Sequence, residues 1–265
     1  MTGDGPRLPA IFLGHGSPMN TLTHNRYSAA WRAIGAALPR PKAILAVSAH
    51  WLRRGSAVTA MDRPPTIHDF AGFPTELFEV QYPAPGDPAL AARVRELLAP
   101  VDVELDRSWG LDHGSWSVLA HLFPAADVPV VQLSLDATRP PSYHYALARR
   151  LAPLRTEGVL ILASGNVVHN LRAMRWGEEA APYEWARRFN EAVRAAVVRG
   201  DHDALIDYLR LDADAHLSVP TPEHYLPLLY VAAQQHPQEA LTLPVDGIEY
   251  GSIGMLSVAV GLSAA

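Results

Sequence analysis

Four histidines of this 265-residue chain lie where an apolar run ends or where a helix is expected to begin. His15, His50 and His169 follow runs rich in Ile, Val, Leu and Ala, and His224 lies in the segment TPEHYLPLLY. Open α/β sheets collect their functional residues at the carboxyl ends of strands, so residues far apart in the sequence can meet there. Because neutral imidazole is the commonest metal ligand in proteins, the repeated placement predicts a histidine-lined metal centre.

Each histidine also has a purely structural interpretation. His15 stands between Gly14 and Gly16, which is typical of a tight turn, and Met19 replaces the third glycine of a dinucleotide-binding fingerprint. His50 follows small apolar residues, and its ring could simply be buried against a carbonyl oxygen. His169 precedes Asn170 in a polar turn. Recurrence of the pattern favours metal ligation over these separate explanations.

His224 differs because a helix is expected to begin just before it. Thr221 is a plausible N-cap and Pro222 a plausible first helical residue, which would place His224 in the first turn. The positive end of a helix disfavours imidazolium, so the ring would stay available as a ligand. His113, in GLDHGSW, and His68, in IHDFAGFP, are further candidates.

Composition narrows the possible classes of protein. A hydrophobic content of 49% allows one well-packed domain spanning residues 1–265. A net charge of −5 argues against nucleic-acid binding. The absence of cysteine leaves only nitrogen and oxygen as metal ligands. With no leader or membrane-spanning pattern, we expect a soluble cytoplasmic protein without a membrane partner.

The apolar pattern predicts alternating strands and helices. Strands are expected over 9–13, 42–48, 56–60, 101–105, 129–135, 158–163 and 254–260. Helices are expected over 27–38, 88–98, 116–122, 143–154, 184–199, 203–209 and 222–235. This alternation predicts an α/β fold: a single-domain three-layer sandwich with a mostly parallel or mixed sheet and helices on both faces. Asp62–Pro88 is expected to be a long irregular segment, of the kind that often forms a binding loop.

Six segments together resemble the class III (LigB-type) extradiol ring-cleavage dioxygenases, and most closely their 4,5-DOPA extradiol dioxygenase branch. They are GHGSPMN, SAHW, HDFAGFP, GLDHGSW, SGNVVHNL and HYLPL, found in the family's order between about Ile11 and Leu256. The resemblance implies an oxidoreductase of aromatic metabolism, with the whole chain as one catalytic domain. Such an enzyme opens a catechol ring beside its two hydroxyl-bearing carbons.

The resemblance also implies roles for the histidines. His15, His50 and His224 would hold Fe(II), and zinc could occupy the same site. His169 would be the acid/base residue and could approach as a fourth ligand, while His113 would lie by the dioxygen position. The usual facial triad includes a carboxylate. We expect His224 rather than Glu223 or Glu249 in that third position, with Glu223 pointing elsewhere.

The expected substrates are O₂ and a DOPA-like or otherwise substituted catechol, giving a muconic semialdehyde-type product. His68, Phe73, Trp116 and Tyr225 are candidate substrate-binding residues because their rings could pack against a planar substrate, and Trp51 could cover the site. Two alternatives remain open, a zinc-dependent hydrolase on the same scaffold and a non-catalytic metal-binding relative. The physiological catechol and any homo-oligomer are left undetermined.

Overall fold

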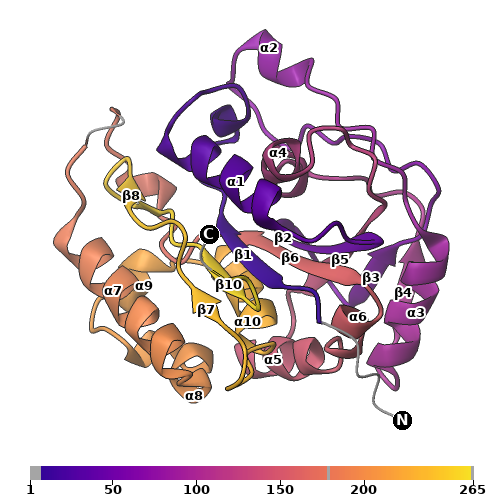
Figure 1. Ribbon diagram of the computed structural model, residues 1–265. Helices are drawn as coiled ribbons and strands as arrows, with labels where there is room; N and C mark the ends of the chain where they lie inside the picture. The colour runs from indigo at the N-terminus through magenta and orange to yellow at the C-terminus, as the bar shows by residue number, and fades with distance from the viewer. Residues whose placement is uncertain (1–6, 178–179, 264–265) are drawn as a thin grey trace.

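A mixed eight-stranded sheet forms the centre of the computed structural model, which describes residues 7–177 and 180–263. The strand order is β4-β3-β5-β2-β6-β1-β10-β7 (Figure 1). The bounds are β1 Ala10–Gly14, β2 Ala43–Arg53, β3 Ser56–Thr59, β4 Val103–Asp106, β5 Val130–Asp136, β6 Val159–Gly165, β7 Leu241–Thr242 and β10 Val258–Val260. A separate hairpin pairs β8 (Ile248–Glu249) with β9 (Ile253–Gly254).

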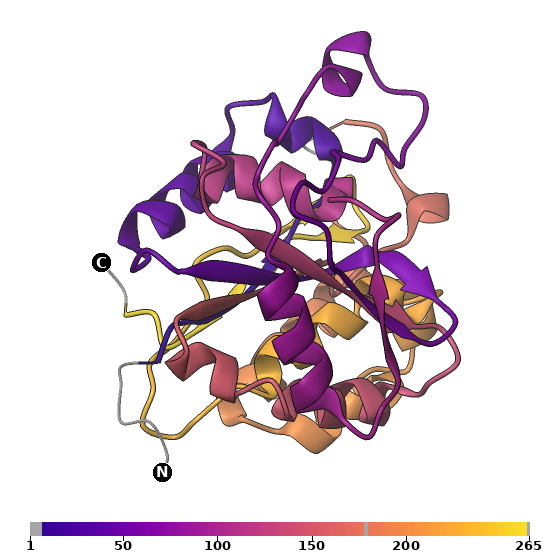
Figure 2. The same cartoon turned by 90° about the vertical axis from the view of Figure 1, so that its right-hand side faces the viewer.

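Helices cover both faces of the sheet, as Figure 2 shows with the sheet across the middle of the view. On one face lie α1 (Arg26–Ala37), α2 (Thr75–Phe78) and α4 (His113–Leu122). The other face carries α3 (Pro88–Leu98), α5 (Pro141–Arg149), α6 (Pro153–Thr156), α7 (Glu184–Arg199), α8 (His202–Ile206), α9 (Ala215–Ser218) and α10 (Leu226–Ala232). Four short 3₁₀ turns are η1 (Pro18–Thr21), η2 (Leu171–Ala173), η3 (Tyr208–Arg210) and η4 (Pro222–His224). The predicted three-layer α/β fold is confirmed.

Alternation along the central strands divides the interior into two cores. In β1, Ile11 and Leu13 pack toward the α1 and α4 layer, whereas Ala10 and Phe12 pack toward the opposite layer. Successive strand residues point to opposite faces, so a strand covered on both faces must be apolar throughout. All five residues of β1 are buried, as are all seven of β6.

Several predicted boundaries are wrong, and proline accounts for two of them. The helix expected over 143–154 is broken between α5 and α6, with Pro153 at the start of α6. The helix expected over 222–235 is divided into η4 and α10, with Pro227 in the first turn of α10. A proline lacks the N–H that would continue a helix, so each starts a new element. The run 254–260 likewise contributes to both β9 and β10.

Strand β2 runs further than expected, through His50 to Arg53. Its parallel pairing with β5 shifts register between Val47 and Leu52. Such an irregularity bends a strand and redirects its side chains. The shift brackets His50, so this histidine lies within an interrupted strand rather than after its end.

The carboxyl ends of β1, β2 and β6 meet at one edge, because β6 pairs in parallel with both β1 and β2. Gly14 and Gly165 are partners at the ends of β1 and β6. Beyond them, Asn166 N donates to the carbonyl oxygen of His224 at 2.8 Å, and its side-chain amide donates to Gly254 O at 2.8 Å. The first bond fixes the η4 turn, and the second fixes strand β9, against the end of β6.

Within the described residues, no helix has both the length and the apolar character needed to cross a membrane.

Substituting Gly165 by alanine is expected to destabilise the fold. A Cβ atom there would lie 2.2 Å from the backbone oxygen of His224, so the η4 turn or β6 must shift. Overpacking of this kind costs about 1–3 kcal/mol. Urea unfolding of Gly165→Ala measures the loss, and Ala36→Ser on the exposed side of α1 is the control, expected within about 0.5 kcal/mol of the parent. Equal stability of Gly165→Ala and the parent would contradict this packing.

Candidate functional site

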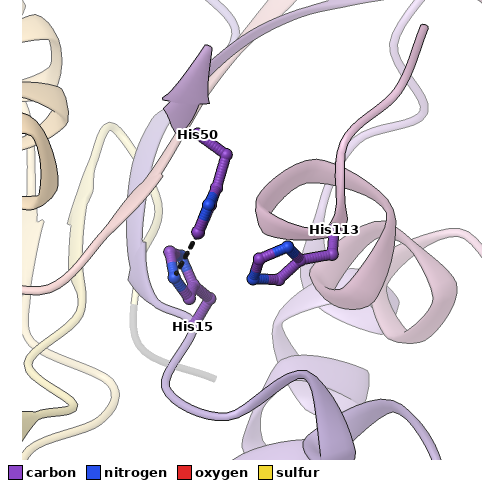
Figure 3. Close-up of side chains that lie close together, drawn as sticks. All are labelled: His15, His50 and His113. Atoms are coloured by element: carbon purple, nitrogen blue, oxygen red, sulfur yellow. Dashed lines mark hydrogen bonds between the residues drawn. The ribbon is translucent and has the colours of Figure 1, made fainter. Parts of the chain in front are cut away.

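Five imidazole rings converge at the base of a pocket of about 700 Å³. They belong to His15, His50, His113, His169 and His224. The ring centroids of His15 and His50 are 5.1 Å apart, and His224 lies 5.5 Å from the first and 5.0 Å from the second. Figure 3 shows the rings of His15 and His50 facing each other, with His113 approaching from α4. The chain thus brings together histidines separated by up to 209 positions, from 15 to 224.

Helix α4 reaches the centre through two local features. The Asp112 carboxylate accepts a hydrogen bond from Ser115 N at 3.1 Å and caps the helix, so that His113 is its first residue. Gly114 then permits close approach, because a Cβ there would lie 2.7 Å from a ring carbon of His50. The ring centroids of His50 and His113 are 3.8 Å apart as a result.

In four of the five rings Nδ1 has a polar neighbour that belongs to none of the other rings. The contacts are Ser164 Oγ for His15 at 2.8 Å, Asp69 Oδ2 for His50 at 3.3 Å, Asp69 Oδ1 for His113 at 2.9 Å and Glu223 Oε1 for His224 at 3.3 Å. Engagement of one ring nitrogen fixes the orientation of the imidazole and leaves the other available as a ligand. The rings are therefore oriented from outside the centre.

The ring nitrogens that make none of these contacts are placed as ligands of a cation would be. Nε2 of His15 and Nε2 of His50 are only 3.3 Å apart. Nε2 of His224 is buried, and no atom of the described residues forms a hydrogen bond with it. A buried polar atom without a partner is costly and needs an explanation. Two facing imidazole nitrogens and a third unsatisfied one are what a bound metal ion would account for.

Burial keeps His15, His50, His169 and His224 neutral. Desolvation, followed by the proximity of the other imidazoles, lowers the pKa of His15 and of His224 well below the usual value. Desolvation and His113 lower the pKa of His50 to about 3, although Asp69 opposes this. Desolvation also lowers the pKa of His169 to about 4. The neutral imidazole is the form that binds a metal ion. Burial alone accounts for this neutral form, so the helix N-terminus that the sequence predicted beside His224 is not needed.

Asp69 links two of the histidines to the long 62–88 segment. One carboxylate oxygen accepts hydrogen bonds from both N and Nδ1 of His113, each at 2.9 Å, and the other faces His50. Burial alone would raise the pKa of Asp69, but the hydrogen bonds and charge of His113, with help from His50, hold it below the usual value. No role was predicted for Asp69 from the sequence. The one feature that could have indicated a role is its position next to His68 in the segment expected to form a binding loop.

His169 is held differently from the other four. Its backbone N donates to Ser218 O at 2.8 Å, and its ring stacks on His224 with centroids 3.4 Å apart and planes 6° apart. Its ring nitrogens form no hydrogen bond within the described residues, and His169 lines the pocket.

The environment of His224 corrects two expectations. Glu223 was expected to point away, but its carboxylate groups with His169 and His224 as a potential metal-binding set. Thr221 was expected to cap a helix, but its hydroxyl donates to Glu223 Oε1 at 2.8 Å and caps nothing. Glu249 belongs to neither of the two potential metal-binding sets found in the described chain.

The four candidate substrate-binding residues are placed unequally. Phe73 lies in the pocket wall beside Phe70. Trp116 is buried behind Phe70, where its indole N–H donates to Ile67 O at 2.8 Å. His68 contacts Val80 O through Nε2 at 2.9 Å. Tyr225 lies in the opposite core and donates to Leu205 O at 2.9 Å. The structure therefore brings only Phe73 of these four to the pocket surface.

Trp51 does not cover the site as expected, because its ring stacks on Trp109 with planes 2° apart. The outer wall is formed instead by Met19, Leu171, Met174 and Trp176. These four residues occupy irregular segments or 3₁₀ turns, where no periodic pattern identifies a pocket-facing side chain.

Comparisons with known proteins agree with this arrangement. The family model described as the catalytic LigB subunit of aromatic ring-opening dioxygenase matches residues 9–254. The chain is 55% identical over 259 residues to an Escherichia coli (strain K12) protein named 4,5-DOPA dioxygenase extradiol, covering 96% of this chain and 95% of that protein. A Beta vulgaris protein of the same name is 36% identical over 255 residues, covering 91% and 94%.

A solved structure shows the same fold. It is the crystal structure of an uncharacterized protein from Escherichia coli K12, with a TM-score of 0.85 and 50% sequence identity, covering 96% of this chain and all of that one. The family match over most of the chain and the histidine centre at the sheet edge lead to one conclusion. The chain belongs to the LigB family of aromatic ring-opening dioxygenases and is a metal-dependent extradiol ring-cleavage enzyme.

Proposed function

We propose that residues 1–265 form one catalytic domain that cleaves a substituted catechol with O₂, using a non-haem Fe(II) ion bound by His15, His50 and His224. The observations that carry the proposal are the 3.3 Å separation of the Nε2 atoms of His15 and His50, the neighbouring ring of His224 and the burial of its Nε2 atom without a protein partner in the described chain. The ligand atoms of His113 group with those of His15 and His50, whereas those of His224 group with His169 and Glu223. Because Asp69 engages Nδ1 of His113, we propose that its other ring nitrogen assists dioxygen and does not bind the metal.

The metal supplies one part of the chemistry. When bound among neutral imidazoles, a divalent ion attracts a catecholate anion and lowers the pKa of its hydroxyl groups. Zinc binds the same ligand types, and we propose it as an alternative occupant without dioxygenase activity.

His169 would accept the second catechol proton. Its ring is neutral at physiological pH because burial lowers its pKa to about 4, and no hydrogen bond from the described residues occupies its nitrogens. The charge of Glu223 favours the imidazolium that forms when the proton arrives. General-base assistance of this kind contributes about 10²–10⁴-fold in rate.

The pocket and the named relatives support the proposed substrate class. A cavity of about 700 Å³ accommodates a catechol with a sizeable substituent. The relatives' names indicate L-DOPA as a substrate to test first, and we propose a muconic semialdehyde-type product. We further propose a cytoplasmic enzyme that acts on small molecules, without nucleic-acid or membrane partners.

Iron-loaded protein is expected to consume O₂ with L-DOPA or caffeate and to form a yellow ring-opened product. The experiment loads metal-free protein with Fe(II) under anaerobic conditions, adds each catechol, and follows oxygen uptake and visible absorbance. Zinc-loaded protein is the control and should consume no oxygen. No uptake by the iron-loaded protein across a panel of catechols would overturn the dioxygenase proposal, and ester or amide hydrolysis by the zinc form would favour the hydrolase alternative.

Substitutions are expected to separate metal ligands from the proton acceptor. His15→Ala, His50→Ala and His224→Ala should lose most bound iron, because each removes one of the three proposed ligand nitrogens. His169→Ala should retain most of the iron while kcat falls about 10²–10⁴-fold. Metal content after dialysis and steady-state oxygen uptake measure the two effects, and exposed His236→Ala is the control. Full iron retention by His224→Ala would exclude His224 from the ligand set.

Metal-free protein is expected to lose stability as pH falls below about 6.5. The pKa values of His50, His169 and His144 are lowered to about 3, 4 and 4, with desolvation the main cause in each. The unfolded chain therefore binds more protons than the folded chain between about pH 6.5 and 4. Each such histidine then lowers the free energy of unfolding by about 1.4 kcal/mol per pH unit.

Urea unfolding of chelator-treated protein at pH 7.5, 6.5 and 5.5 measures this effect. The stability contributed by the neutral histidines is fully present above pH 6.5 and declines toward pH 4. Exposed His236→Ala should show the same profile as the parent. A flat profile between pH 7 and 5 would contradict the burial of neutral imidazoles.

A further inference from the structure

Asp69 contacts three nitrogen atoms of the histidine centre with only two carboxylate oxygens. Its Oδ1 accepts hydrogen bonds from N and Nδ1 of His113, each at 2.9 Å. Its Oδ2 faces Nδ1 of His50 at 3.3 Å. The rings of His50 and His113 lie beside each other, with centroids 3.8 Å apart (Figure 3). One carboxylate therefore faces the same nitrogen, Nδ1, of two neighbouring imidazoles.

This arrangement determines where each ring carries its hydrogen. An ionised carboxylate has only acceptors, so the Nδ1 atom of His113 that bonds to it must be protonated. A neutral imidazole has a single N–H, and its other nitrogen is the one that can bind a metal or accept a hydrogen bond. As a metal ligand through Nε2, His50 must also carry its hydrogen on Nδ1, the atom that Asp69 faces. Asp69 thus favours the same tautomer in both rings.

The carboxylate of Asp69 is itself held in place by its neighbours in the chain. On one side, the indole N–H of Trp116 donates to Ile67 O at 2.8 Å and fixes the segment on α4. On the other side, the ring of Phe70 packs edge-on against His113, with centroids 5.4 Å apart. The Asp69 side chain is only 17% exposed. Its oxygens are therefore placed by packing, as is required of a group that orients other side chains.

The second carboxylate beside His113 is engaged elsewhere. Asp112 is buried and accepts hydrogen bonds from Ser115 N at 3.1 Å and from the side-chain amide of Gln132. It caps α4, whereas Asp69 contacts the imidazole nitrogens.

We propose that Asp69 is a positioning residue of the reaction, whose carboxylate fixes the Nδ1–H tautomer of both His50 and His113 and so leaves both Nε2 atoms free of hydrogen. This rests on the proposed function, because it takes His50 as a metal ligand and assigns His113 to dioxygen. A partner that orients a metal ligand in this way typically affects metal affinity or activity by about 10–100-fold.

Asparagine and alanine at position 69 separate tautomer control from packing. An amide has one acceptor oxygen and a donor NH₂ group, so Asp69→Asn places a donor against the Nδ1–H of at least one ring. If the amide oxygen stays on His113, the NH₂ group faces His50 and favours a hydrogen on its Nε2, which then cannot bind a metal. Asp69→Ala removes the acceptors without adding a donor. Tautomer control therefore predicts that asparagine is the more damaging substitution, whereas a packing role predicts that alanine is.

Zinc affinity tests this order without any turnover. Metal-free protein competes for zinc with a chromophoric chelator, and circular dichroism checks that each variant is folded. Asp69→Asn is expected to raise the Kd for zinc about 10–100-fold, and Asp69→Ala by less than about tenfold. Asp62→Asn, which changes an exposed carboxylate of the same segment outside the cavity lining, is the matched control and should leave the Kd unchanged. An unchanged Kd in Asp69→Asn, or a larger loss in Asp69→Ala, would overturn the proposal.

Nuclear magnetic resonance reads the tautomer in the parent protein itself. The zinc-loaded protein is labelled with ¹⁵N at histidine, and the His113 ring is assigned from the signals that His113→Gln loses. Long-range ¹H–¹⁵N correlation is expected to show His113 protonated on Nδ1 alone. A bare Nδ1, or a ring protonated on both nitrogens, would overturn the proposal even if no variant at position 69 folds.

These measurements distinguish failure of the proposal from failure of the proposed function. If the iron-loaded parent consumes no O₂ with any catechol while zinc affinity follows the predicted order, the reaction is wrong and the role of Asp69 in orienting the rings is supported. If the parent consumes O₂ and its zinc affinity equals that of Asp69→Asn and Asp69→Ala, the role of Asp69 alone is overturned.

Discussion

The cost of assembling neutral imidazoles away from water is the constraint on which the rest of the site depends. Five rings share one buried region, where desolvation and neighbouring imidazoles lower the pKa of His15, His50 and His224. The fold meets this cost with partners behind the rings: a serine hydroxyl, the Asp69 carboxylate and Glu223. The side chains outside the centre therefore determine what its nitrogens can bind.

Backbone packing supports this arrangement as much as side-chain chemistry does. Gly165 lets the η4 turn lie against the end of β6, and Gly114 lets α4 approach His50. The parallel pairing of β6 with both β1 and β2 brings their carboxyl ends to one edge. Small residues at these contacts allow ring-to-ring distances that larger residues would prevent.

The layers of the fold and the central histidines were predictable from the sequence, for different reasons. Buried strands such as β1 and β6 are continuous apolar runs, so their existence and the three-layer class follow from periodicity. The histidines followed those runs and matched family segments. Tyr225 and Trp116 were expected at the pocket because aromatic rings suit a planar substrate, but the same rings suit a core equally well, and both are buried there. The positions of Asp69 and of the outer-wall residues depend on long-range contacts of irregular segments, which local patterns do not encode.

The register shift of β2 near His50 and the wide spacing of the histidines have a thermodynamic consequence. Because His15 and His50 are 35 positions apart in the sequence, and His50 and His224 are 174 positions apart, no short peptide of this chain contains all three proposed ligands. An ion that needs all three binds the native chain and not its unfolded ensemble, so its binding energy adds to the stability of the entire sheet. Metal availability is thereby coupled to the persistence of the folded protein, and not only to its turnover.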